Sequence, residues 1–398
     1  MTPDLSLLVY FNSGYNALPQ DRFGSALFAG EFIKTNAGFR GASSDEIAKV
    51  PECNEVTRSI RISERFAGIF MSAPAKKAEN AFRIASLTIT DPYMGNDKVL
   101  KQMKDKKLEA LGEPKKDAVR FNEACDSLIY GNHPWSAEID SSAVEGVDMT
   151  LVGEIYRREF NPSLGMTVFI AGNLDEAQVK EYVCKYIASI PDGDRSVRKS
   201  GIKERVPSFK GVSEFSMTGK KEINPYTLVS RIFSSKVKPA TESIAAVDFV
   251  DYILSQRLLN QIREKRGGTY TIRFSSTVSV REKGRSESEV TFKTRPDLYK
   301  ALVGDLDDVI SEFNAEGPTE KELEEARTWL IKNNLESKAK RSESMSHRNS
   351  QVMNYVRNGI DPNKDWEAAY KKVSAEDVRK AAAKLTGRNS LTVIYTEE

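Results

Sequence analysis

The spacing of apolar residues changes along the chain, and this change predicts a mixed α+β fold. Strand-like apolar runs lie at 5–14, 53–63, 66–74, 225–235, 269–280 and 286–295. Helix-like runs, with apolar residues three or four apart, lie at 23–38, 243–264 and 317–340, and three more fill 75–130. Strands come in mixed order with helices clustered after them. We therefore expect mixed, mainly antiparallel sheets with helices packed mostly on one face.

Two helix starts carry a local signature. Ser43 is followed three residues later by Glu46, and Thr319 by Glu322. In a capping box, the side chain of the first residue accepts a hydrogen bond from the backbone N–H of the second. The side chain of the second residue accepts one from the backbone N–H of the first. Each pair therefore predicts the first turn of a helix.

A weak internal repeat divides the chain into two similar halves. The segment VDMTLVGEIYRREFNPSLGMTVFIAG resembles VSAEDVRKAAAKLTGRNSLTVIYTEE. Four pairs keep nearly the same separation, of 225 to 228 residues: Leu108 and Leu335, Gly131 and Gly359, Val147 and Val373, Thr167 and Thr392. Four anchors in the same order indicate a duplicated domain. We predict a first α+β domain at 1–195, a polar linker at 196–208 and a second domain at 209–398.

Composition and charge narrow the class of protein. The chain has 398 residues, 39% apolar and 29% charged, with a formal net charge of +2. This is an ordinary globular mixture and gives no support for a nucleic-acid partner. No apolar run approaches the length of about 20 residues that a membrane span needs. The compartment stays open: cytoplasm, or a periplasmic or organellar space if a signal lies upstream of this segment.

The common catalytic motifs are missing. The chain has two histidines, His133 in a Gly-Asn-His-Pro turn and His347 in a polar helix-like stretch. A catalytic zinc takes about three protein ligands, and neither HExxH nor HxxEH occurs. GxSxG, GxxxxGK[ST] and GxGxxG are also absent. We therefore expect no metal, no catalytic residue and no nucleotide site within this chain.

One joint remains as a candidate site, the segment NQIREKRGGTY at 260–270. Helical spacing runs up to Ile262, and Gly267 or Gly268 supplies a left-handed stop. Arg263 then lies in the last helical turn, where the helix dipole favours a cation. Tyr270 starts a strand, on the face of Ile272. Local physics alone describes a helix-end cation and a core tyrosine, seven residues apart.

Over nearly its whole length, the chain resembles the pitrilysin/insulinase-type zinc metallopeptidases. LLNQIREKRGGTYTIRFSS, PTEKELEEARTWLIKN and KVSAEDVRKAAAKLTGRNSLTVIY resemble the last domain of that family. SDEI, YGNHPWS and FNPSLGMTVFIAGNLD resemble the domain before it. The resemblance covers nearly the entire chain in order. It implies the C-terminal, non-catalytic half, with FGSALFAGEFIK standing where the catalytic half has its HxxEH helix.

The resemblance also implies a role for the joint. In the family, an Arg and a Tyr seven apart reach a peptide bound in a closed chamber, which falls here on Arg263 and Tyr270. Zinc is expected in the catalytic half, either in the same longer protein or in a separate HxxEH-bearing subunit. The implied function is to bind peptide substrate for a zinc-dependent endopeptidase. The alternative is a non-enzymatic scaffold built on the same peptidase fold.

Overall fold

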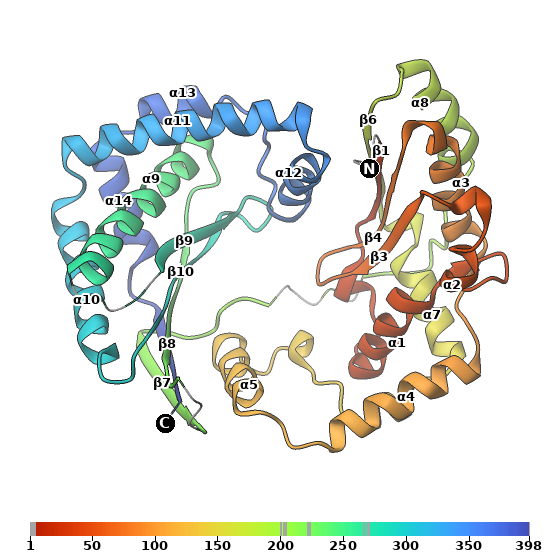
Figure 1. The fold of residues 1–398 in the computed structure, drawn as a ribbon, viewed down its shortest axis with the longest axis horizontal. Coiled ribbons are helices and arrows are strands. Elements are labelled where there is room, and N and C mark those ends of the chain that lie inside the picture. The colour runs from red at the N-terminus through yellow and green to blue at the C-terminus, as the bar shows by residue number, and fades with distance from the viewer. Residues whose placement is uncertain are drawn as a thin grey trace. The chain divides into compact units, whose positions relative to one another are not determined.

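The computed structural model describes residues 5–199, 201, 205–220, 224–265, 267, 269 and 271–397. The chain divides into two compact units (Figure 1). Unit 1 contains Met1–Pro114, Asn132–Arg205 and Ser344–Asn349, and unit 2 contains Lys115–Gly131, Val206–Glu343 and Ser350–Glu398.

Unit 1 is built on an antiparallel sheet with the strand order β3-β4-β1-β6. Its strands are β1 (Leu5–Phe11), β3 (Thr57–Ile62), β4 (Ala67–Ala73) and β6 (Met166–Gly172), and β2 (Gly38–Phe39) pairs separately with β5 (Pro92–Tyr93). The nearly continuous apolar sequence of β1 fits its central place, because this strand pairs with β4 on one side and β6 on the other.

Helices of unit 1 cover the sheet and close its core. They are α1 (Phe23–Asn36), α2 (Ser44–Ile47), α3 (Ala78–Thr90), α4 (Asp97–Gly112), α6 (Ser141–Glu145), α7 (Met149–Glu159) and α8 (Glu176–Tyr182), which runs on as the π-helix η6 (Val183–Ile187). Short 3-10 turns are η1 (Gly14–Ala17), η2 (Pro51–Cys53), η3 (Ala75–Lys77), η4 (Pro134–Ser136) and η5 (Pro162–Leu164). The capping box between Ser43 and Glu46 is confirmed at the start of α2.

Unit 2 has a larger sheet with the order β7-β11-β8-β10-β9. Its strands are β7 (Val212–Gly219), β8 (Thr227–Lys236), β9 (Ile272–Ser279), β10 (Arg285–Thr294) and β11 (Ser390–Glu397). Strand β7 runs parallel to β11, and the other neighbours are antiparallel. The predicted mixed, mainly antiparallel architecture is confirmed.

Most helices of unit 2 lie on one face of its sheet, and α5 lies on the other (Figure 1). The helices of unit 2, on both faces together, are α5 (Asp117–Tyr130), α9 (Thr241–Leu258), the π-helix η7 (Leu259–Lys265), α10 (Tyr299–Glu316), α11 (Glu320–Glu343), α12 (Met345–Asn358), α13 (Trp366–Lys372) and α14 (Ala375–Leu385). Phe121 and Cys125 of α5 pack with Leu391, Val393 and Tyr395 of β11. The bonds of the predicted capping box link Thr319 and Glu322 at the start of α11.

The two units share one topology. The order β3-β4-β1-β6 matches β9-β10-β8-β11, and β7 is an additional edge strand in unit 2. The repeat anchors fall in matching places: Leu108 and Leu335 in α4 and α11, Gly131 and Gly359 just after α5 and α12, Val147 and Val373 just before α7 and α14, Thr167 and Thr392 in β6 and β11. The predicted domain boundaries stay a prediction. In space, α5 groups with unit 2 and Ser344–Asn349 with unit 1.

Candidate functional site

The candidate joint begins where the central helix of unit 2 changes its winding. Helix α9 is α-helical to Leu258 and then continues as the π-helix η7 over Leu259–Lys265. Leu258 and Ile262 are both fully buried, so the inner face of the helix stays in the core through the change. π-turns are rare in proteins, and many of those known lie at functional sites. The sequence predicted a helix here but not this wider turn.

Two residues after η7, Gly267 and Thr269, have defined contacts. Gly267 has φ +60 and its N–H donates to the carbonyl of Arg263 at 2.8 Å, the left-handed stop predicted at this position. Thr269 is buried, and its hydroxyl donates to the carbonyl of Lys293 on β10 at 2.7 Å. Strand β9 starts three residues later, at Ile272. Thr269 is therefore tied to strand β10.

Arg263 is presented to solvent at this joint. Its side chain is 49% exposed, and among the described residues it pairs with its sequence neighbour Glu264, with Nε and Oε1 3.6 Å apart. Such an exposed pair contributes only about 0–1 kcal/mol, so the guanidinium is available for another acceptor. Tyr270, the second predicted residue, lies outside the described residues. Its place beside Arg263 stays a prediction.

A polar sheet face next to the joint was not singled out from the sequence. Arg273 of β9 is exposed and lies opposite Thr291 of β10 in the ladder. Thr291 and Ser230 both donate hydrogen bonds to Glu289, at 2.7 and 2.5 Å. Every second residue of β10 from Glu289 to Lys293 is exposed. This alternation of every second residue is visible in the sequence of β10, and it indicates a solvated sheet face of mixed charge.

The histidines do not form a metal site. The Nδ1 atom of His133 accepts from the backbone N–H of Trp135 at 3.1 Å and caps the short turn η4. His347 lies on α12. Among the residues that the structure describes, no group of three or more His, Cys, Asp or Glu side chains is placed to hold a metal ion.

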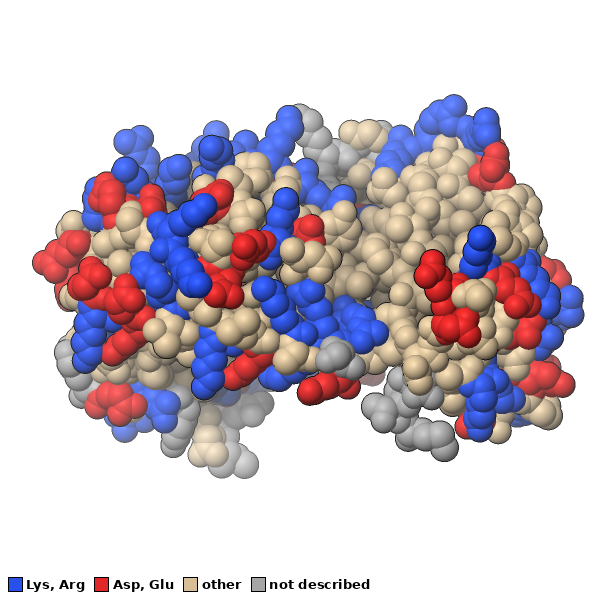
Figure 2. Space-filling model, turned by 90° about the horizontal axis from the view of Figure 1, so that it is seen from above, with Lys and Arg blue, Asp and Glu red and all other residues tan. Residues whose placement is uncertain are grey.

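The charges on the visible surface are mixed rather than gathered into one basic patch. On the face shown in Figure 2, Lys and Arg side chains are interspersed with Asp and Glu, in keeping with the net charge of +2. None of the helices in the described ranges is long and apolar enough to cross a membrane.

Comparisons with known proteins agree with this architecture. Residues 152–330 match a family model described as the peptidase M16 inactive domain. No curated protein matches the chain significantly. Among solved structures, the periplasmic protease PqqL from Escherichia coli is 20% identical with a TM-score of 0.81, and the alignment covers 99% of this chain and 43% of PqqL.

Two further structures are similar. The ferredoxin protease FusC, solved as a point mutant in complex with Arabidopsis ferredoxin, is 16% identical with a TM-score of 0.77, over 99% of this chain and 42% of FusC. A peptidase M16 inactive domain from Pseudomonas fluorescens is 17% identical with a TM-score of 0.75, over 99% of this chain and 93% of that one. At such identities the likeness shows the fold alone. The chain spans less than half the length of PqqL and FusC.

The first half of PqqL, solved separately, is also similar, at 13% identity and a TM-score of 0.75, over 98% of this chain and 86% of that one. The fold therefore does not distinguish one half of such a protease from the other. The resemblance predicted from the sequence is confirmed: residues 152–330 match the peptidase M16 inactive domain, and the whole chain shares its fold with PqqL, FusC and a solved peptidase M16 inactive domain.

Proposed function

We propose that this chain is the substrate-binding, non-catalytic half or subunit of a zinc-dependent endopeptidase. It would bind peptide through Arg263 and Tyr270. An HxxEH-bearing half would hold the zinc, in the same longer protein or in a separate subunit. The zinc would activate the water that attacks the peptide, and this chain would position the peptide.

The observation that carries the proposal is the end of α9. The π-helix η7 replaces the last α-helical turns over Leu259–Lys265, and such π-turns are rare and often found at functional sites. Within η7, Ile262 stays buried and Arg263 stays half exposed. The buried Ile262 anchors the backbone next to Arg263, and the arginine's guanidinium stays accessible.

The chemistry of the two side chains fits this role. The guanidinium of Arg263 has five N–H donors in a fixed plane and suits the carbonyl groups of an extended peptide. A tyrosine hydroxyl at position 270 would donate to the oxyanion that develops when the peptide carbonyl is attacked. Neither side chain needs to change its protonation state.

Kinetics of the assembled enzyme test these roles. In the chain purified with its HxxEH-bearing half, we expect Arg263→Ala to lower kcat/KM about tenfold, which corresponds to about 1.4 kcal/mol. Tyr270→Phe should lower kcat by about 100-fold with little change in KM, because the bond forms only in the transition state. Arg295→Ala is the matched control, since Arg295 is also exposed and pairs with a nearby acid, Asp297.

Two outcomes would reject the proposal. Unchanged kinetics in both variants would remove the substrate role and favour the scaffold alternative. One chelator-removable zinc per isolated chain, with chelator-sensitive proteolysis, would show that the chain is catalytic by itself. We expect the isolated chain to show neither.

A further inference from the structure

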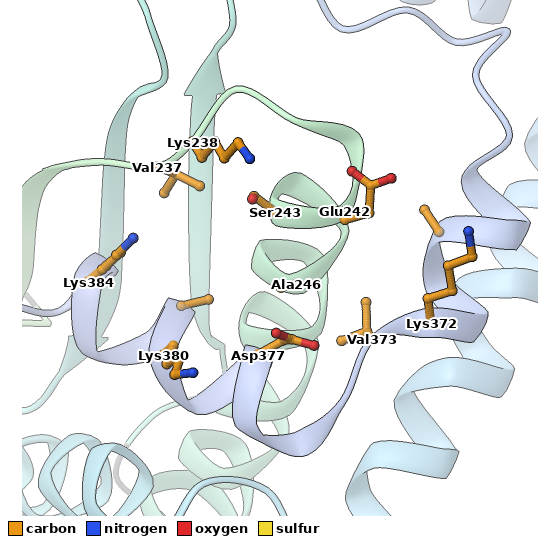
Figure 3. A pocket seen from close by; sticks show the side chains of 12 residues that line it. Val237, Lys238, Glu242, Ser243, Ala246, Lys372, Val373, Asp377, Lys380 and Lys384 are labelled. Carbon is orange, nitrogen blue, oxygen red and sulfur yellow. The ribbon is translucent and has the colours of Figure 1, made fainter.

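A pocket of about 340 Å³ lies in unit 2, between the first turns of α9 and the helices α13 and α14 (Figure 3). Buried apolar side chains line it: Val237, Ala246, Ala369, Val373 and Ala381. This volume lies within the range of small-molecule sites, which combine an apolar lining with a few polar groups. The proposed function does not use this pocket.

Cations outnumber anions in the lining. Lys238, Lys372, Lys380 and Lys384 line it, with Glu242 and Asp377 as the acidic members. Figure 3 shows these side chains arranged around the head of α9. Asp377 is already engaged, because its carboxylate accepts from the hydroxyl and the backbone N–H of Ser374 at 2.6 and 3.1 Å.

Most of this positive charge has no acidic partner. Within the described part of the chain, Lys238, Lys372 and Lys384 form no ion pair. Lys380 pairs at 3.3 Å with Glu376, which lies outside the lining. With four lysines against two carboxylates, the lining carries a net formal charge of +2.

In unit 1, the position that matches the pocket carries an acidic residue paired with arginines. Counting from the matching N-caps Asp148 and Ser374, the position of Lys380 in α14 is that of Glu154 in α7. Glu154 accepts ion pairs from Arg22 and Arg158, at 2.5 and 3.1 Å. One copy of the fold thus places an acid between two arginines where the other places a lysine.

The same place is also closed in unit 1. A Cβ added to Gly24 of α1 would lie 2.9 Å from the carbonyl oxygen of Glu138 and 3.0 Å from the Cβ of Ala143. A Cβ on Gly146 would lie 2.9 Å from the hydroxyl of Ser25. Counted from the same N-caps, the position of Gly146 is that of Lys372. Unit 1 therefore packs tightly where unit 2 leaves a pocket.

We propose that this pocket binds a small organic anion, with a carboxylate or phosphate head and a short apolar body. The lysines would hold the head at the rim, and the buried Val and Ala side chains would contact the body. The same charges disfavour a cation of similar shape. The site is open to solvent, so salt weakens its electrostatic part.

Calorimetry on the isolated full chain tests this with hexanoate, hexyl phosphate and hexylamine as probes. We expect saturable binding of at least one of the two anions, weakened as salt rises, and no binding of hexylamine. The stronger of hexanoate and hexyl phosphate identifies the preferred head group. Absence of binding by both anions, or equal binding of hexylamine, would overturn the proposal.

Charge variants locate the site. We expect two substitutions, Lys380→Glu and Lys372→Glu, each to weaken binding about three- to tenfold, the range expected for reversing an exposed charge. Lys380→Glu introduces the acidic residue that unit 1 has at this position. Glu242→Gln should strengthen it about two- to threefold, because it removes a repulsive charge. The control is Lys371→Glu, since Lys371 lies on the same helix but pairs with Glu367 at 2.7 Å and does not line the pocket.

Unchanged affinity in both Lys380→Glu and Lys372→Glu would overturn the assignment even if an anion binds. Lys384→Gln is a milder substitution at an exposed position, and it keeps the test valid if a charge reversal impairs folding. The assay needs neither a peptide nor a catalytic half, so its failure is independent of the proposed function.

Discussion

Units 1 and 2 have the same strand order and matching helices, yet they differ at both ends of their central helix and at one core position. Helix α1 ends as an ordinary α-helix at Asn36, whereas α9 continues as a π-helix toward Arg263. The head of α1 is closed by close backbone contacts, whereas the head of α9 faces a cationic pocket. The shared topology comes from the sheet and its buried faces. The differences in chemistry lie where helices begin and end.

The differing core position lies at the last residue of α7 and of α14. It is Glu159 in unit 1 and Leu385 in unit 2, and both are fully buried. The Oε2 atom of Glu159 accepts from the backbone N–H of Gly14 at 2.9 Å, and Oε1 has no partner among the described residues. Burial raises the pKa of Glu159 to about 8, partly offset by hydrogen bonds from Ser13 and Gly14. Near neutral pH this carboxyl is therefore largely protonated.

The largest effect is expected from copying the acid into unit 2. Leu385→Glu should lower the free energy of unfolding by about 4 kcal/mol at pH 7, because Leu385 lies in an apolar cluster that offers no prepared donor to a carboxyl. Urea denaturation, combined with hydrogen exchange in peptides from α14 and β11, would measure the loss and show that it starts in unit 2.

Leu385→Met is the control, since it keeps the volume and apolar character and should cost less than about 1.5 kcal/mol. Equal stability of Leu385→Glu and Leu385→Met would show that this position in unit 2 tolerates an acid. The difference between Leu385 and Glu159 would then not affect the free energy of unfolding.

The second prediction concerns pH. The folded-state pKa of Glu159 is raised from an ordinary 4.5 to about 8, so between these values the folded state holds a proton that the unfolded chain has released. Raising the pH across this window should therefore lower the stability of unit 1, by on the order of 3 kcal/mol. Glu159→Gln should remove most of this dependence, because the amide keeps an oxygen acceptor for Gly14 and does not ionise.

Local measurement is needed, because burial also raises the pKa of Asp248 and Asp251 in unit 2, to about 7 and about 6. Hydrogen exchange of α7 and β1 peptides at pH 5 and pH 8 separates the two units. Glu145→Gln, at an exposed position of α6, removes a charge without touching the core and should keep the wild-type slope. A slope in Glu159→Gln as steep as in the wild type would contradict the assignment.

Much of the fold follows from the sequence because it depends on local patterns. The apolar run of β1, the two capping boxes and the left-handed Gly267 each need only their neighbours to form. The repeat anchors also fall at matching elements, because duplicated copies keep the residues that turn and bury the chain.

The remaining features depend on contacts between distant parts of the chain, which the sequence alone does not reveal. The apolar stripe of α5 shows that Phe121 and Cys125 are buried, but not that their partner is β11, more than 250 residues away. The spacing of Leu258 and Ile262 fits both an α-helix and a π-helix. Nothing in the segment RREF marks Glu159 as a core residue, because only the distant loop at Gly14 gives its carboxylate a donor.

The smallest effect comes from testing the closed helix head. Gly24→Ala in α1 should destabilise unit 1 by about 1–2 kcal/mol, because its Cβ would meet the backbone of Glu138, which cannot rotate away. Gly304→Ala in α10 is the matched control in unit 2: its Cβ would meet nothing within 4 Å, and we expect stabilisation by about 0.5–1 kcal/mol. Thermal unfolding with hydrogen exchange compares the two. If Gly24→Ala were as stabilising as Gly304→Ala, the head of α1 would have room for a side chain. The contrast between a closed head in unit 1 and an open, cationic one in unit 2 would then rest on charge alone.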